Sequence, residues 1–179
     1  LVGQERSIVS EIPGTTRDAV DTLVTYNDRQ VLIVDTAGLR RRGSISPGIE
    51  RYSSLRSIRA IDRADVAILV LDTTELATAQ DAHIANYILE AYKGIVLAVN
   101  KWDLAKEFGL NKETATRRVR ERFKFAPFAP ICFISAFRKT GLDTMMNTVQ
   151  SVSDEWHKGV PRYDLRRTVL TAVAAHPPA

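Results

Sequence analysis

Several features that define common protein classes are absent from this sequence. It has one cysteine, Cys132, which excludes an internal disulfide and fits a reducing cytoplasm. The longest apolar runs, such as residues 66–71, are far too short to cross a bilayer. The three histidines, His83, His157 and His176, lack the spacing of metal ligands. We therefore expect a cytoplasmic protein that does not engage a membrane and has no histidine-based metal site.

The net charge is small, unlike that of a disordered or a strongly basic chain. The 179 residues include 25 Lys and Arg against 21 Asp and Glu, a formal net charge of +4, and 45% of them are hydrophobic. This composition is ordinary for a globular protein, and the length suffices for one α/β domain with its own core. The positive charge permits an anionic partner such as RNA without requiring one.

Apolar runs with strand character alternate with amphipathic stretches of helical period. This alternation predicts βαβ units and a mostly parallel sheet with helices on both faces, which is an α/β fold. A hairpin with its turn at Asn27-Asp28-Arg29 precedes the pattern, and we assign Met145 and Met146 to the core. The expected strands are 19–26, 30–35, 66–72, 94–99 and 131–135, and the expected helices are 49–63, 80–92, 112–122, 142–156 and 164–175.

The stretch Asn100-Lys101-Trp102-Asp103 follows the apolar run 95–99, at the end of a strand where open α/β sheets bind ligands. An ionised Asp103 only accepts hydrogen bonds, so it favours a base edge with two N–H donors, which guanine offers and adenine does not. The Asn100 side chain can hold either the neighbouring loops or the N7 edge of the base. The aliphatic stem of Lys101 can cover the face of the ring. A chance polar turn after a strand is the alternative interpretation.

A second polar stretch, Asp35-Thr36-Ala37-Gly38, ends the strand 30–35. In a nucleotide site Asp35 would hold Mg²⁺ through a water molecule, because Mg²⁺ keeps part of its hydration shell. Gly38 has no side chain, so its N–H would approach a terminal phosphate closely. The alternative is an aspartate that caps a turn at the end of a strand.

A third stretch, residues 13–18, is a loop that contains Thr15 and Thr16. A threonine hydroxyl there can bind Mg²⁺ while its backbone N–H meets the γ-phosphate, and we favour Thr16 for both contacts. Both would vanish when that phosphate leaves, so the loop would act as a switch. A plain Gly/Thr turn is the alternative.

The pair Ser135-Ala136 follows the strand 131–135, at the same end of the sheet as Asn100. Its backbone N–H groups would donate to O6 of guanine, an acceptor that adenine lacks. The pair carries no information alone and supports the assignment only together with the other stretches.

In chain order, these stretches resemble the G domain of the translation-factor-related GTPases, and the likeness narrows to one family. Gly-Thr-Thr-Arg-Asp-Ala-Val-Asp-Thr (14–22), Asp-Thr-Ala-Gly-Leu-Arg-Arg-Arg-Gly (35–43), Ile-Glu-Arg-Tyr-Ser (49–53) and Asn-Lys-Trp-Asp (100–103) resemble the second G domain of the Der (EngA) family. Its members are bacterial ribosome-assembly GTPases with two tandem G domains and a C-terminal KH-like domain. The resemblance covers essentially the whole chain.

The resemblance implies a P-loop NTPase-type G domain over residues 1–158, a linker at 159–163 and the truncated start of a KH-like domain at 164–179. It implies a monomeric GTP-hydrolysing switch in large-subunit assembly. GTP or GDP and Mg²⁺ would be its ligands, and the ribosomal subunit and rRNA would be partners of the full-length protein, whose first G domain and KH-like domain contact this one. The implied catalytic residues are Thr16 and Gly38, the nucleotide-binding residues are Asn100, Lys101, Asp103, Ser135, Ala136 and Thr15, and the metal ligands are Thr16 and Asp35.

Leu39 departs from Ras-like enzymes, which place a glutamine there to orient the attacking water. Leucine neither donates nor accepts a hydrogen bond, so we expect slow turnover that depends on K⁺ near the threonine loop or on the ribosome. A GTP-sensing module that docks on rRNA with negligible turnover of its own is the alternative function. Arg40-Arg41-Arg42 would either contact rRNA phosphates or form a solvated basic loop.

The sequence contains no Gly-x-x-x-x-Gly-Lys-Ser/Thr phosphate loop. The family carries this loop, after its first strand, just ahead of the position that matches Leu1. There its backbone cradles the phosphates, and its Lys and Ser hold the β- and γ-phosphates and Mg²⁺.

If the phosphate loop is truly absent, these 179 residues should bind GTP weakly and hydrolyse it at a negligible rate. Calorimetric titration of the 179-residue chain with GTP should then show no micromolar affinity, whereas a longer protein that includes the loop should show it. Micromolar binding by the 179-residue chain would contradict this expectation.

Overall fold

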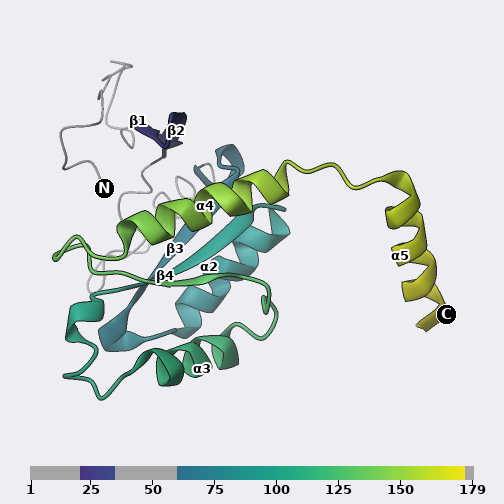
Figure 1. The fold of residues 1–179 in the computed structure, drawn as a ribbon. Helices are drawn as coiled ribbons and strands as arrows, with labels where there is room; N and C mark the ends of the chain where they lie inside the picture. The colour runs from purple at the N-terminus through teal and green to yellow at the C-terminus, as the bar shows by residue number, and fades with distance from the viewer. Residues whose placement is uncertain (1–20, 35–59, 176–179) are drawn as a thin grey trace, which may run out of the picture.

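The computed structural model describes residues 21–34 and 60–175 of the chain (Figure 1). Within these ranges no helix is both long enough and apolar enough to cross a membrane. The elements, in chain order, are β1 (Thr22–Tyr26), β2 (Arg29–Ile33), β3 (Val66–Asp72), the 3₁₀ turn η1 (Thr73–Glu75), α2 (Ala79–Glu90), β4 (Gly94–Asn100), the 3₁₀ turn η2 (Trp102–Leu104), α3 (Lys112–Arg122), β5 (Ile131–Phe133), α4 (Leu142–Trp156) and α5 (Arg162–Ala175).

The centre of the fold is a parallel sheet in the order β3-β4-β5. β4 pairs with β3 along its whole length, from Val66 opposite Gly94 to Asp72 opposite Asn100. β5 pairs with the second half of β4, beginning with Ile131 opposite Leu97. Because all three strands run in the same direction, their carboxyl ends meet at one edge of the sheet.

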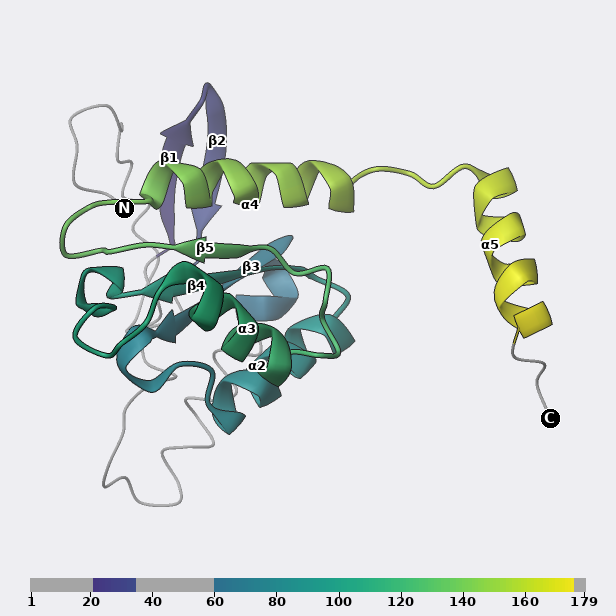
Figure 2. The same cartoon turned by 60° about the horizontal axis from the view of Figure 1, so that its bottom comes forward.

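The side chains of β4 divide the core into two layers. Ile95, Leu97 and Val99 belong to the cluster on the face covered by α2 and α3, and Val96 and Ala98 to the cluster on the face covered by α4. All five are at most 2% exposed. Figures 1 and 2 show α4 on one side of the sheet and α2 and α3 on the other. A strand buried on both faces reads as a continuous hydrophobic run, which is the pattern of this segment in the sequence.

The hairpin of β1 and β2 forms a separate antiparallel sheet. Its turn consists of Asn27 and Asp28, whose φ angles of 49° and 60° are both in the left-handed region. A two-residue turn of this kind matches the right-handed twist of the flanking strands, and Asn and Asp tolerate the conformation better than most residues.

The tip of the hairpin is held against α4 by polar side chains. The Tyr26 hydroxyl donates to the Asn147 side chain at 3.1 Å, and the Asn27 amide donates to Asn147 and to Gln150 at 3.0 and 3.2 Å. Gln150 in turn donates to the Tyr26 carbonyl at 3.0 Å. At the other end of the hairpin, the Arg63 guanidinium pairs with the Asp21 carboxylate. The hairpin is therefore attached at both ends by partly exposed polar groups.

The last helix, α5, contributes no buried residue. It lies away from the sheet in both views (Figures 1 and 2). Arg162 and Tyr163, which the sequence assigned to the linker, belong to this helix. The division of the chain into a G domain and the start of a KH-like domain stays a prediction.

The structure confirms the expected strands and helices within the described residues and shifts some of their limits. The predicted turn was one residue too long, since Arg29 already pairs with Tyr26 across the hairpin. The predicted strand 131–135 ends at Phe133, because Ser135 leaves the sheet to pair with Thr140. Met145 and Met146 are 2% and 5% exposed, as expected for core residues. Most of the expected helix 49–63 lies outside the described residues.

Gly141 should be the least replaceable glycine among those described. Its φ is 74°, and an added Cβ would lie 2.3 Å from the Phe133 carbonyl oxygen, which cannot move without disturbing β5. We expect Gly141→Ala to lower the free energy of unfolding by about 2–4 kcal/mol, from backbone strain plus steric overlap.

Gly109 provides the matched control, because its φ is 61° and nothing lies within 4 Å of an added Cβ. Gly109→Ala should therefore cost only the backbone strain, about 1 kcal/mol. Urea unfolding of both variants measures the difference, and equal losses would show that the contact at Gly141 relaxes.

Candidate functional site

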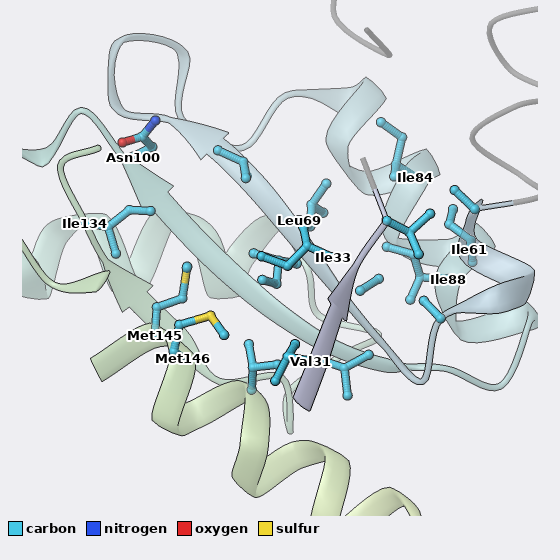
Figure 3. Close-up of a pocket in the computed structure, with 18 of the residues that line it drawn as sticks. Val31, Ile33, Ile61, Leu69, Ile84, Ile88, Asn100, Ile134, Met145 and Met146 are labelled. Carbon is cyan, nitrogen blue, oxygen red and sulfur yellow. The ribbon is translucent and has the colours of Figure 1, made fainter. Parts of the chain in front are cut away.

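Polar residues from three strands meet at the carboxyl edge of the parallel sheet. Asp72 ends β3, Asn100 ends β4 directly opposite it, and Ser135 follows β5 by two residues. Figure 3 shows Asn100 at the end of its strand, next to Ile134. The predicted base-binding residues from the 100–103 and 135–136 stretches are therefore brought together, as parallel strands require.

Asn100 links the loops that follow the three strands. Its backbone carbonyl accepts a hydrogen bond from the Thr73 hydroxyl at 2.6 Å, and its side-chain oxygen accepts one from the Ala136 N–H at 3.0 Å. Of the two roles that the sequence left open for Asn100, the structure shows the loop-holding one.

The two N–H groups expected to donate to O6 of guanine both have internal acceptors. Ala136 donates to Asn100, and Ser135 donates to the Thr140 carbonyl at 3.0 Å. A base at this site would have to share or release the Ala136 donor. The assignment of these groups to O6 stays a prediction.

Asp103 is positioned by the loop after β5. The Ser135 hydroxyl donates to Oδ1 of Asp103 at 2.5 Å and accepts the Arg138 N–H at 3.0 Å. The Arg138 Nε lies 3.9 Å from the other carboxylate oxygen of Asp103. Ser135 therefore fixes one oxygen of Asp103. The side chain is 12% exposed, so the carboxylate is not fully buried.

Lys101 adopts a left-handed conformation, with φ 60° and ψ 34°. Its Nζ pairs with the Asp72 carboxylate at 2.9 Å, although the lysine side chain itself is half exposed. The backbone N–H and the hydroxyl of Thr74 also donate to Asp72, at 2.9 and 2.8 Å. Lys101 is thus held at the carboxyl end of β3 by its ion pair with Asp72. Its contact with the face of a base stays a prediction.

Asp72 is strongly acidic because of these partners. Burial alone would raise its pKa, but the hydrogen bonds from Lys101 and Thr74 and the positive charge of Lys101 outweigh it and lower the pKa to about 2. The carboxylate is therefore ionised at neutral pH and provides a fixed negative charge beside the Lys101 ammonium.

Trp102 anchors the loop that carries Asp103. Its backbone N–H donates to the Ile134 carbonyl at 3.0 Å, and its ring centroid lies 4.3 Å from that of Phe133 at a tilt of 49°. This backbone hydrogen bond fixes the distance between the loop that carries Asp103 and the chain after β5 that carries Ser135.

Three contributors were missed by sequence reasoning, namely Asp72, Arg138 and the Ser135 hydroxyl. Asp72 carried a usable signal, since it ends an apolar strand just as Asp35 does. Arg138 carried none, because its place beside Asp103 depends on the course of the loop after β5.

The residues expected at the phosphate and the metal lie outside the described part of the chain. They are Thr15, Thr16, Asp35, Gly38, Leu39 and the three arginines that follow it. Within the described ranges no group of three or more His, Cys, Asp or Glu side chains is placed to hold a metal ion. The base contacts of the described residues, like the metal and phosphate contacts, stay predictions.

Comparison with known families agrees with this arrangement. A family model described as 50S ribosome-binding GTPase matches residues 1–101. The chain belongs to this family. It is also 46% identical over 178 residues to the GTPase Der of Herpetosiphon aurantiacus and to that of Chloroflexus aggregans. These alignments cover 99% of this chain but only 39% and 40% of the relatives, so the chain spans about two fifths of their length.

Solved structures confirm the predicted fold class. Era of Aquifex aeolicus bound to GDP·AlF₄⁻ is 25% identical, with a TM-score of 0.62 over 90% of this chain and 52% of that one. Era in complex with MgGDPNP and a 16S ribosomal RNA segment has a TM-score of 0.61 at 24% identity, over 89% of this chain and 51% of that one. The chain therefore has the fold of a P-loop GTPase G domain.

The interaction between Lys101 and Asp72 generates a pH prediction. Because the folded-state pKa of Asp72 is lowered, its contribution to stability is present above pH 4 and is lost as the pH falls towards 2. At pH 7, Asp72→Asn should lower the free energy of unfolding by about 1–2 kcal/mol, a value reduced for the solvent around Lys101.

Carboxyl carbon NMR provides the direct measurement. Asp72 should titrate with a pKa near 2 in the parent chain, and Lys101→Met should raise that pKa towards 3.8. Lys106→Met, an exposed lysine five residues on, is the control and should leave it unchanged. An unchanged Asp72 pKa in Lys101→Met would show that Lys101 does not cause the shift.

Proposed function

We propose that this chain is the nucleotide-binding domain of a GTP-hydrolysing switch that acts in assembly of the large ribosomal subunit. The observation that carries the proposal is the placement of Asp103. Its carboxylate is fixed at the carboxyl edge of the sheet by Ser135, in a loop joined to β4 through Asn100. Membership of the 50S ribosome-binding GTPase family supports the same function.

Selection of guanine would follow from the chemistry of Asp103. An ionised carboxylate accepts hydrogen bonds only, and guanine presents N1–H and the 2-amino group on one edge. Adenine presents an unprotonated N1 there and would be repelled. The Arg138 guanidinium is mostly exposed and lies 3.9 Å from the carboxylate, so a base can displace it at little cost.

Hydrolysis would transfer the γ-phosphoryl group of GTP to water and yield GDP and phosphate. Asp35 and Thr16 would hold Mg²⁺, which supplies charge stabilisation at the phosphates, and the Gly38 N–H would meet the γ-phosphate. Leu39 cannot orient the water, so turnover would depend on K⁺ near Thr15-Thr16 or on the ribosome. The main contacts to the phosphates would come from the phosphate loop, which these 179 residues do not contain.

The proposed partners are rRNA and the ribosomal subunit, reached through a longer, monomeric protein in the cytoplasm. A structural neighbour, Era, is described in complex with a 16S ribosomal RNA segment. The net charge of +4 is compatible with an RNA surface. The remaining three fifths of the relatives' length would include the first G domain and the KH-like domain as intramolecular partners.

A GTP-sensing scaffold with negligible turnover is the second candidate function, and Leu39 favours it as much as it favours slow hydrolysis. Single-turnover release of phosphate by the full-length protein separates the two. The measurement compares K⁺ with Na⁺, each with and without ribosomal particles. Hydrolysis that rises with K⁺ or with the particles supports the enzyme, whereas occupancy without release in every condition supports the scaffold.

Asp103→Asn in the full-length protein tests guanine recognition. Losing a charged hydrogen-bond acceptor should weaken GTP binding by roughly 10- to 100-fold. Because the asparagine amide can donate to the 2-oxo group of xanthine, the variant should gain affinity for xanthosine triphosphate. Competitive displacement of a fluorescent nucleotide measures both affinities.

Glu107→Gln is the matched control, since it removes an exposed carboxylate four residues from Asp103. It should leave both affinities unchanged. Equal loss of GTP and xanthosine triphosphate in Asp103→Asn would mean that Asp103 supports the loop rather than reads the base.

A further inference from the structure

The net positive charge of the chain is concentrated in one short segment, residues 112–124, which comprises α3 and the two residues after it. Of the 25 Lys and Arg and the 21 Asp and Glu in the chain, this segment holds six and two, which leaves 19 of each sign for the rest. The formal charge of +4 therefore belongs to this segment alone. A local excess of this kind is expected on a surface that binds a polyanion.

Three of the six cations, Arg117, Arg118 and Lys124, are available to a partner. All three are exposed, and no ion pair or side-chain hydrogen bond within the part of the chain that the structure describes engages them. Arg118 and Arg122 also line a surface hollow of about 370 Å³, together with Glu121. Because a planar guanidinium group can bind two oxygens of one phosphate at once, these arginines are suited to a phosphate backbone.

The loop after α3, residues 123–130, adds two exposed aromatic rings. Phe125 is 40% exposed and Phe128 is 69% exposed, whereas every third residue of the loop, namely Phe123, Ala126 and Ala129, is fully buried. This alternation places both rings on the outer side of the loop. Large apolar side chains that gather on a surface beside cations are typical of a binding site.

Backbone hydrogen bonds hold this loop in one conformation. The Ala126 N–H donates to the Phe123 carbonyl at 2.9 Å, and the Ala129 N–H donates to the Ala126 carbonyl at 3.1 Å. The Arg120 guanidinium donates to the Ala129 carbonyl at 2.8 Å, and the two prolines of the loop restrict its backbone further. The loop would therefore lose little conformational freedom when a partner binds to the rings.

The rings and the cations together favour RNA with unpaired bases as the partner. Lys124 directly precedes Phe125, and Arg118 and Arg122 precede that ring by seven and three residues, on one side of α3. Cations that contact phosphates, combined with rings on which bases stack, bind single strands with little sequence preference. Paired bases are already stacked on one another and cannot use the rings. A membrane interface favours Trp and Tyr over Phe, and an acidic peptide would not need the rings.

We propose that α3 and the loop after it bind unpaired RNA through a basic-aromatic surface, which is formed by Arg117, Arg118, Arg122, Lys124, Phe125 and Phe128. The loop enters β5 at the end of that strand opposite to Ser135, so RNA and a nucleotide could be bound at the same time. α3 lies on the same side of the sheet as α2 (Figures 1 and 2). The proposal rests on the RNA-related function proposed above but not on recognition of guanine.

Photo-cross-linking of the full-length protein, without nucleotide, tests which residues touch the RNA. The probe is a single-stranded RNA of roughly 12 nucleotides that contains 4-thiouridine. Mass spectrometry after irradiation should find adducts within residues 117–128, and the same RNA annealed to its complement should give far fewer there. Adducts confined to other parts of the protein, or no adducts at all, would overturn the proposal.

Phe128→Ala and its control Phe108→Ala test stacking, because Phe108 is another exposed phenylalanine, at 48%. In fluorescence anisotropy without nucleotide, Phe128→Ala should weaken binding of the single strand by roughly 5- to 100-fold and leave duplex binding nearly unchanged. Phe108→Ala should change neither affinity. Equal affinities of the two variants for the single strand would contradict stacking and overturn the proposal.

Lys124→Gln and its control Lys106→Gln test the phosphate contacts, since both lysines are exposed. The slope of log affinity against log salt concentration should become shallower by about 0.7 in Lys124→Gln and stay unchanged in Lys106→Gln and in Phe128→Ala. An unchanged slope in Lys124→Gln would count against the proposal.

Two parallel measurements separate this proposal from its alternatives. If Lys124→Gln and Phe128→Ala release the protein from vesicles that contain phosphatidylserine and leave RNA binding intact, the surface contacts a membrane and the proposal is wrong. GTP affinity of the same variants should equal that of the parent protein. A parent protein that does not bind GTP but shows the RNA effects would contradict the proposed GTPase function and leave the basic-aromatic surface supported.

Discussion

The burial of β4 on both of its faces is the constraint on which the rest of the structure depends. Each of its five central side chains contributes roughly 1.5–3 kcal/mol by leaving water, except the smaller Ala98. The two layers they form on opposite faces leave the strand no freedom to shift by one residue. Since the register is fixed, Asn100 must end opposite Asp72, so hydrophobic packing within the sheet sets the position of its polar edge.

The polar contacts at that edge fix the relative positions of the loops that follow β4 and β5. Asn100 and Trp102 each join the loop after β4 to the chain after β5 through a backbone group. Ser135 then fixes one oxygen of Asp103. A carboxylate held in this way would lose little conformational freedom on binding a base, and such pre-organisation would raise affinity without adding contacts.

The sequence predicted the strands, the α/β class and the cluster of Asn100, Asp103 and Ser135, because each rests on local patterns and on the rule that parallel strands end together. It could not predict that Asp72 would pair with Lys101 or that Arg138 would approach Asp103. These contacts join residues 29 and 35 positions apart, and they depend on loop paths that no local pattern encodes.

The attachment of the hairpin has a further consequence for how the molecule responds to its surroundings. Asn27, Asn147 and Gln150 at the tip, and Asp21 with Arg63 at the base, are partly exposed groups that exchange their partners with water readily. Tyr26 and Val31 also pack against the apolar cluster beneath α4, so the hairpin is held by apolar contacts as well as polar ones. Salt should therefore weaken the Arg63–Asp21 ion pair at the base of the hairpin, whereas the neutral amide contacts at its tip should not respond to ionic strength.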